Sequence, residues 1–258
     1  MNKKFIIIVT TAILGFAFAF SVAAQTSAPT TGAGLKDRVK DLRQNIGNIK
    51  IQTKTELTDI KIKAKRAELN IQLKATQEAA KKRIEAAREE AKKAVEARQT
   101  ELKDKISKLR DEKKKQIATR LDEQMARLNV QWTDHFSNVL NRLSEILGKI
   151  ELRATKAETS GKDVTAVKAA IQNAKAAIET ARTSVETQAK KTYVATFSSE
   201  TGLGAAFKAV RDQLHKDLFG LRDGAMKSAR QAVQNALQAL KGVPKVDEES
   251  KATTTPSQ

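Results

Sequence analysis

The chain lacks cysteine altogether and has only three prolines, eleven glycines and 4% aromatic residues in its 258 positions. Without cysteine there is no disulfide bond, thiol catalysis, cysteine-based metal site or lipid-modified cysteine. The shortage of proline and glycine leaves long stretches without the residues that end helices. The chain is rich instead in Ala, Lys, Gln and Glu, a composition typical of long helices and coiled coils. We therefore expect an all-α protein.

Residues 1–24 have the pattern of a targeting segment. Lys3 and Lys4 precede an apolar run, and Val22 and Ala24 at its end fit the small-residue rule for signal-peptide cleavage. We expect cleavage after Ala24. The apolar run is also long enough to span a bilayer, so an uncleaved N-terminal anchor is the alternative. Both interpretations predict an exported protein that is secreted, periplasmic or associated with the cell envelope.

A linker and a short coiled-coil seam follow. Residues 25–34 are rich in Ser, Thr, Pro and Gly and have no apolar pattern, as is typical of a flexible linker. Gly47 lies inside the seam and predicts a kink or break, because glycine in a helix costs about 1 kcal/mol relative to alanine. The seam has the four-three spacing of a coiled coil and consists of Leu35, Val39, Leu42, Ile46 and Ile49.

The most regular feature of the chain is an aliphatic stripe with a period of eleven residues. Every eleventh residue from Ile51 to Ile150 is Ile, Leu or Val. Eleven residues fill about three turns of an α-helix, so the stripe stays nearly straight along one helix. We therefore expect a very long N-terminal helix that continues into the rest of the fold. The candidate interaction stripe in its first part consists of Ile62, Leu73, Ile84, Val95 and Ile106.

Residues 35–116 form a basic arm in this interpretation, with 25 basic against 14 acidic residues. A positively charged rod attracts anionic polymers or lipid headgroups. The alternative is a solvated helix face that binds nothing. The arm has no aromatic residues for base stacking, so we expect no sequence-specific nucleic-acid binding. The candidate contacts for a polyanion are Lys81, Lys82, Arg83, Lys92, Lys93, Lys113, Lys114 and Lys115.

The arm is followed by three amphipathic helices. The first should end around residues 158–161, with Asp163 as the N-cap of the second, and the third should stop at residues 241–242. Short connections make neighbouring helices antiparallel, which predicts a three-helix bundle over residues 117–242. Residues 243–258 have no apolar pattern and are expected to be a disordered tail. The predicted core consists of Leu128, Trp132, Phe136, Val139, Leu143, Ile171, Ile178, Val185, Phe207, Leu214 and Leu218.

The two histidines, His135 and His215, flank this predicted core. Catalysis or metal binding needs convergent partners with defined geometry, and no HExxH, GxSxG or pair of carboxylates accompanies them. An alternative is that they face each other across the bundle as a pH-sensitive pair. We predict no catalytic, metal-binding or cofactor-binding residues, and no enzymatic activity.

The stretch WTDHFSNVLNRLSEILGKI, followed by GKDVTAVKAAIQNAKAAIETAR and QAKKTY, resembles a group of uncharacterised exported helical proteins from candidate-phyla bacteria. The resemblance covers the bundle, roughly residues 117–241, and implies an envelope setting without implying an activity. The outline of a basic exported protein with long helical arms is also similar to Skp-type periplasmic chaperones. Those carry a β-rich trimerisation body and paired arm helices, and this sequence predicts neither.

These features predict an exported, non-enzymatic structural or interaction protein of the cell envelope. Its arm would serve as a spacer, as an oligomerisation element or as a rod that binds anionic polymers or surfaces. One alternative is a holdase chaperone that uses the aliphatic stripe to hold unfolded clients. A further alternative is a weak membrane-surface helix, although one aliphatic residue plus alanines per three turns is a narrow face for lipid insertion.

Overall fold

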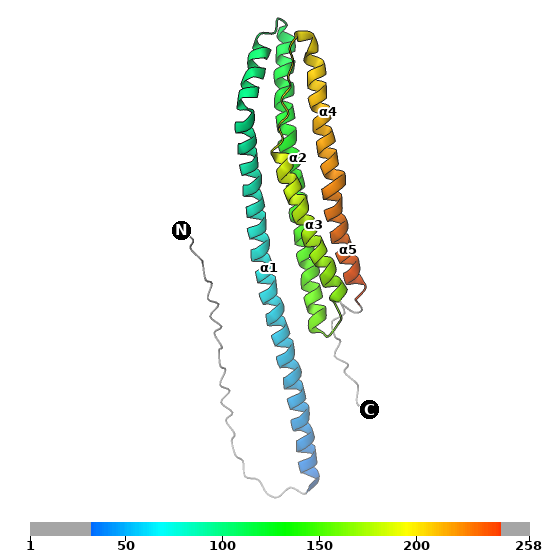
Figure 1. The fold of residues 1–258 in the computed structure, drawn as a ribbon. Coiled ribbons are helices and arrows are strands. Elements are labelled where there is room, and N and C mark those ends of the chain that lie inside the picture. Colours follow the sequence, from blue (N-terminus) through cyan, green and yellow to red (C-terminus); the bar gives the residue numbers. More distant parts are fainter. Residues whose placement is uncertain (1–31, 244–258) are drawn as a thin grey trace, which may run out of the picture. The chain divides into compact units, whose positions relative to one another are not determined.

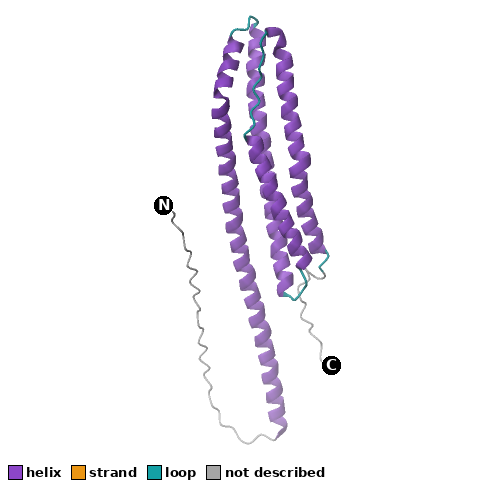
Figure 2. Cartoon of the chain, in the orientation of Figure 1, coloured by secondary structure: helices purple, strands orange, loops and turns teal. Residues whose placement is uncertain are grey.

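The computed structural model describes residues 32–243, with side chains from Lys36 onward. Contacts divide the chain between Gln52 and Thr53, so residues 32–52 and residues 53–243 are each described by themselves. The predicted signal segment lies outside the described residues, as do most of the linker and the tail after Val243. The described residues form helices joined by loops and contain no β-strand (Figure 2), which confirms the predicted all-α class with a very long N-terminal helix.

Helix α1 (Gly32–Ser107) is continuous through Gly47. The predicted break at this glycine is therefore wrong. One glycine in a helix costs about 1 kcal/mol, whereas a break would give up several hydrogen bonds and require a second costly nucleation. The Lys-, Glu- and Ala-rich sequence on both sides favours helix, and the single glycine does not interrupt it.

The predicted continuity of the long helix into the bundle is also wrong, because the chain turns back at residues 108–111. Helix α2 (Glu112–Thr159) starts after Asp111, whose backbone is extended at φ −89° and ψ 112°. Asp111 Oδ1 accepts the backbone N–H groups of Lys113 at 2.8 Å and Lys114 at 3.3 Å. This is an N-cap, which satisfies two of the donors left over at a helix start. Asp111 therefore begins a new helix.

Residues 53–107 of α1 run antiparallel to α2 (Figure 1). Gln77 Nε2 donates to Glu145 Oε1 at 3.5 Å, and Arg88 Nη2 donates to Asp134 Oδ1 at 2.8 Å. A later residue of α1 thus meets an earlier residue of α2. Much of the stretch expected to be an arm apart from the bundle therefore packs on the bundle as an additional helix.

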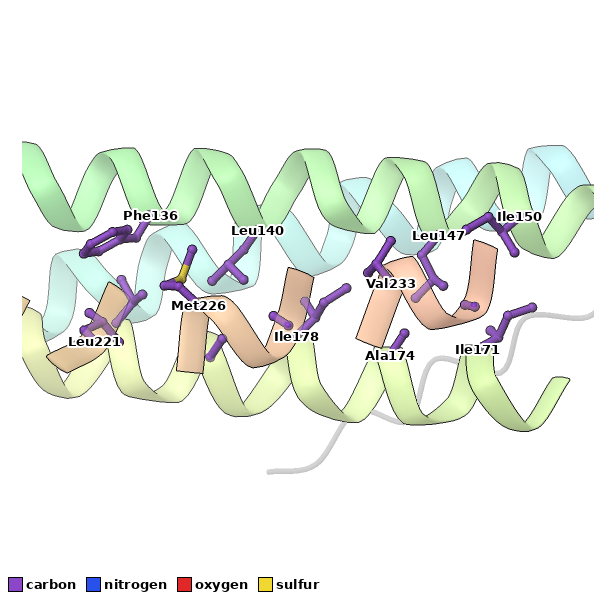
Figure 3. Close-up of a cluster of buried hydrophobic side chains, with 14 of the residues drawn as sticks. Phe136, Leu140, Leu147, Ile150, Ile171, Ala174, Ile178, Leu221, Met226 and Val233 are labelled. Atoms are coloured by element: carbon purple, nitrogen blue, oxygen red, sulfur yellow. The ribbon is translucent and has the colours of Figure 1, made fainter. Parts of the chain in front are cut away.

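The remaining helices complete the bundle. Helix α2 packs against α3, α4 and α5, and α3 packs against α5. Apolar side chains from α2, α3 and the last helical stretch meet between them (Figure 3). The elements after α2 are α3 (Thr165–Ala189), the short 3₁₀ helix η1 (Glu200–Gly202), α4 (Leu203–Leu221), the π-helical segment η2 (Arg222–Met226) and α5 (Lys227–Lys241).

The α2–α3 turn uses both residues that the sequence indicated. Gly161 has a φ of 78°, which favours glycine, and Lys162 donates its N–H to the Ala157 carbonyl at 3.0 Å to close the end of α2. Asp163 Oδ1 accepts the N–H of Thr165 at 2.9 Å, but the N-cap position of α3 is held by Val164, so the predicted N-cap is one residue too early. This backbone hydrogen bond holds the pKa of Asp163 below its ordinary value. The turn reverses the chain, so α2 and α3 lie antiparallel.

The π-helical segment η2 changes the register of the last helix. A regular helix would place Ala225 in the core after Leu221, but Met226 takes the fully buried position and Ala225 is half-buried. A π segment inserts one extra residue into a helical turn. The apolar positions before η2 and those from Ala229 onward therefore face the same core (Figure 3).

Among the described helices, none combines the length and the apolar character that crossing a membrane requires.

Candidate functional site

The predicted interaction stripe of α1 lies mainly against the bundle. Ile84, Val95 and Ile106 are buried, and Ile62 and Leu73 are half-buried. The buried alanines Ala80, Ala87 and Ala91 lie on the same face of α1. Together they make a face wide enough to pack, although the aliphatic stripe alone is narrow. Three of the five stripe residues are therefore covered by the protein itself.

A second, smaller apolar cluster fixes the end of α1. Leu102, Ile106 and Leu109 pack there with Ala118 at the start of α2. The stripe changes phase at the turn, because Ile117 is 56% exposed whereas the next residue, Ala118, is fully buried. The other members of this cluster come from the loop after α3 and from α4: Ala195, Leu203 and Phe207.

Polar contacts also join α1 to the bundle. Arg88 Nη2 donates to Thr133 Oγ1 at 2.7 Å and to the Val130 carbonyl at 3.2 Å, in addition to its bond with Asp134. Arg83 Nη2 forms an ion pair with Glu179 Oε1 of α3 at 2.9 Å. These contacts bring together residues far apart in the sequence and fix the register of α1.

The candidate polyanion contacts do not form one free patch. Arg83 is engaged by Glu179, Lys114 Nζ contacts Glu200 Oε1 at 2.8 Å, and Lys115 Nζ contacts Glu112 Oε1 at 2.6 Å. The hydrogen bond between Lys114 and Glu200 raises the pKa of the lysine and lowers that of the glutamate. The exposed members of the set are Lys81, Lys82, Lys92, Lys93, Lys113 and the paired Lys114.

The predicted bundle core divides into two levels of burial. The buried members lie on α2, α3 and α4: Phe136, Ile171, Ile178, Val185, Phe207, Leu214 and Leu218. The members that pack against the core while partly exposed all lie on α2: Leu128, Trp132, Val139 and Leu143. Helix α1 covers part of α2, which the three-helix prediction did not include.

Each histidine has an aromatic neighbour on its own helix. The rings of His135 and Trp132 meet edge to face with centroids 5.9 Å apart, and the rings of His215 and Phe219 lie 5.6 Å apart. Both histidines are exposed. They occupy the positions of residues that flank a core. Among the described residues, no group of three or more His, Asp or Glu side chains is placed to hold a metal ion.

A buried polar network joins α2, the end of α3 and α4, and sequence reasoning missed it. Gln188 Nε2 donates to Asn129 Oδ1 at 3.0 Å and to the Tyr193 hydroxyl at 2.7 Å. The Tyr193 hydroxyl donates to Asp217 Oδ2 at 2.8 Å, and Lys191 Nζ forms an ion pair with Asp217 Oδ1 at 2.9 Å. The network holds the loop after α3 against the bundle.

The network shifts the pKa of its two acidic groups. Burial, together with the hydrogen bond to Asp217, raises the pKa of Tyr193, so its hydroxyl remains a donor. Burial alone would raise the pKa of Asp217. Hydrogen bonds from Lys191, Tyr193 and Gln213 outweigh burial and hold the pKa of Asp217 below its ordinary value. These shifts fit a structural clamp whose donors and acceptors are matched.

Within residues 32–52, by contrast, the coiled-coil seam of α1 is exposed. Val39 is 45% exposed, Leu42 is 60% exposed and Ile46 is 52% exposed. In a heptad with Val39 and Ile46 at position a and Leu42 at position d, the residues that flank the seam are basic or neutral. These flanking residues are Lys36, Arg38, Arg43, Asn45 and Lys50. We call this surface the basic seam.

Comparison with known protein families, with curated proteins and with solved structures gives no match for this chain.

Proposed function

We propose that this is an exported, non-enzymatic interaction protein that uses the basic seam to bind an acidic partner helix. The observation that carries the proposal is the exposure of large apolar side chains, Val39, Leu42 and Ile46, along a helix face bordered by cations. Exposed apolar side chains in a row, rimmed by charged residues, are typical of protein interaction sites. The bundle then serves as the folded body that carries this helix.

The flanking charges favour a different chain over a second copy. Flanking heptad positions set partner choice in coiled coils. Lys36, Arg38, Arg43 and Lys50 flank the seam, and no acidic residue occupies a flanking position between them. Two copies would bring like charges together, whereas an acidic helix would neutralise them. β-branched Val39 and Ile46 at position a with Leu42 at position d suit a two-stranded pairing.

A rod that binds anionic polymers is the second candidate. The exposed side chains of Lys81, Lys82, Lys92 and Lys93 support it. Exposed glutamates at 85, 89, 90 and 96 alternate with these lysines and reduce the local positive field. A polymer would also leave the apolar residues of the basic seam without a role. We therefore rank this function below helix binding.

A holdase role would have to use the same N-terminal part of α1. Ile84, Val95 and Ile106 are covered by the bundle, so these stripe residues offer no surface to an unfolded client. Leu57, Ile60 and Ile71 are exposed and would be the available apolar positions of α1 after residue 52. A membrane-surface role would rest on the same few residues. The narrow apolar face makes both roles weaker candidates than helix binding.

The proposal is tested with the full mature chain and a synthetic helical peptide that has Leu and Ile at its core heptad positions and Glu at the flanking positions. We expect saturable binding by fluorescence anisotropy that weakens as salt rises. Leu42→Gln with Ile46→Gln should abolish binding because it removes the apolar contacts. Arg38→Gln with Arg43→Gln should weaken it, whereas Lys40→Gln on the outer face of the same helix should have little effect.

Three outcomes would overturn the acidic-helix proposal. One is the absence of peptide binding together with heparin retention that survives Leu42→Gln with Ile46→Gln, which would favour the polymer rod. Another is a dimer in light scattering that this double variant dissociates, which would favour self-association. A third is equal binding by the double variant and the parent chain. Export is tested separately: mass spectrometry of the protein from its native cells should show Gln25 as the first residue.

A further inference from the structure

An apolar groove lies between α1, α2 and α3 within residues 53–243. Its volume is about 430 Å³, which is within the range of small-molecule sites, about 300–1,000 Å³. Apolar side chains from all three helices line it, with Leu69 and Leu73 from α1, Leu147 and Leu152 from α2, and Ile178 from α3. The groove is therefore built by the packing of α1 on the bundle.

The groove begins where the line of buried alanines on α1 ends. From Ala80 to Ala91, small buried alanines lie on the face of α1 that packs on the bundle. Before Ala80 this line of alanines stops, and Leu69, Leu73 and Thr76 face the groove instead.

Arg182 of α3 forms part of the groove wall and is only 4% exposed. Its Nη2 donates to Asn141 Oδ1 at 2.9 Å and to Ser144 Oγ at 3.3 Å, both neutral acceptors. Its Nε and Nη1 atoms have no acceptor within the described part of the chain. Burial lowers the pKa of Arg182, in keeping with a cation removed from water. The guanidinium thus lacks the hydrogen-bonded negative partner that a buried arginine normally has.

Each of the three acidic residues of the groove has a partner other than Arg182, and Glu145 accepts from the amide of Gln77 at 3.5 Å. Glu151 forms ion pairs with Lys175 at 2.8 Å and with Lys65 at 3.7 Å. Glu179 pairs with Arg83 at 2.9 Å. A buried charge without a hydrogen-bonded counter-charge is costly, so a negative group brought to Arg182 would be strongly favoured.

We propose that this groove binds an acyl carboxylate, with its hydrocarbon chain against the leucines and its carboxylate on Arg182. The apolar lining would desolvate the chain, and hydrogen bonds to a guanidinium strengthen when the acceptor is charged. The leucines already line the groove, whereas Nε and Nη1 of Arg182 are enclosed by protein, so the carboxylate reaches them when the Arg182 side chain turns towards the groove. This site is separate from the basic seam and does not depend on the proposed function.

The test uses dodecanoate as the probe and dodecanol as the matched ligand without the charge, with the mature chain below the concentration at which dodecanoate forms micelles. We expect calorimetry to detect one dodecanoate per chain and weaker binding of dodecanol. Arg182→Met should weaken dodecanoate binding by about tenfold or more and leave dodecanol binding nearly unchanged. Arg211→Met, at an exposed arginine of α4, is the matched control and should leave both affinities unchanged.

Leu73→Trp provides a second test that leaves Arg182 in place. The larger side chain should fill part of the groove and weaken both ligands, and circular dichroism checks that each variant is folded. No binding of dodecanoate to the parent chain would overturn the proposal. Equal binding of dodecanoate and dodecanol, or binding that survives both Arg182→Met and Leu73→Trp, would overturn it as well.

Discussion

The two ends of helix α1 have similar sequences and different surroundings. The stretch from 80 to 109 buries its aliphatic face, including Ile84, Val95 and Leu102. The stretch from 36 to 60 leaves its aliphatic residues exposed, with Leu42 at 60% and Ile60 at 62%. Both stretches carry regularly spaced aliphatic residues and many lysines. Periodicity of apolar residues therefore does not decide which part of a helix is buried.

The residues beside the aliphatic positions differ between the two stretches. In the buried stretch, Ala80, Ala87 and Ala91 widen the apolar face without holding the helices apart. In the exposed stretch, Arg38, Arg43 and Lys50 stand beside the seam instead. Charged flanks cost desolvation when they are buried without partners. A face bordered by alanine suits packing within the chain, whereas a face bordered by cations suits an acidic partner from outside.

The largest expected effect on stability is that of truncating a leucine in the packed stretch, compared with a leucine in the exposed seam. Leu102 is 2% exposed, and Leu102→Ala should lower the free energy of unfolding by about 3 kcal/mol, because it removes buried contacts and leaves a cavity. Leu42→Ala at the exposed seam should change it by less than about 0.5 kcal/mol. Urea denaturation followed by circular dichroism measures both values. Equal effects of the two substitutions would contradict the division of α1 into a packed and an exposed stretch.

Local patterns in the sequence predicted the helices but not the fold-back of α1. The all-α class and the glycine at Gly161 follow from composition and from rules that act over a few residues, and the predicted N-cap at Asp163 is one residue from the observed one at Val164. An eleven-residue period is the same in one long helix and in two helices joined by a short turn. The available signal was Asp111 followed by Glu112, a cap residue and an acid at a helix start, inside an otherwise helical pattern. The cap signal at Asp111 therefore indicates the start of a new helix, which the eleven-residue period does not.

The polar sites depend on long-range packing and could not be found from local patterns. Asn129, Gln188 and Asp217 are far apart in the sequence and meet only because α2, α3 and α4 pack in one register. Arg182 lies on the face of α3 that packs against α2, but α1 must fold back before it lines a groove. Sequence reasoning had placed no residues of α1 at this position. The missing step was the turn at residues 108–111.

An intermediate effect on stability is expected from the buried network of Gln188, Tyr193 and Asp217. This network holds the loop that carries Ala195 against the end of α1. Because the folded-state pKa of Asp217 is below its unfolded value, its stabilising effect is complete at neutral pH and is lost as pH falls below about 4. Asp217→Asn should cost about 1–2 kcal/mol at pH 7, since hydrogen bonds to charged groups are stronger than neutral ones. Urea denaturation from pH 7 to pH 3 should show the gap between parent and variant shrinking. A gap that is constant with pH would contradict a charged Asp217 in this network.

The smallest expected effect on stability tests whether the chain turns back between α1 and α2. If α1 and α2 were one continuous helix, Asp111→Ala would stabilise the protein slightly, because alanine is the better helix former. With Asp111 as the N-cap of α2, the same substitution should destabilise it by about 1 kcal/mol, since the N–H groups of Lys113 and Lys114 lose their acceptor. Asp104→Ala, an exposed position inside α1 paired with Lys108, is the control and should change stability by less than about 0.5 kcal/mol. Thermal unfolding of both variants distinguishes the two architectures by the sign of the change at Asp111, which does not depend on the exact size of either contribution.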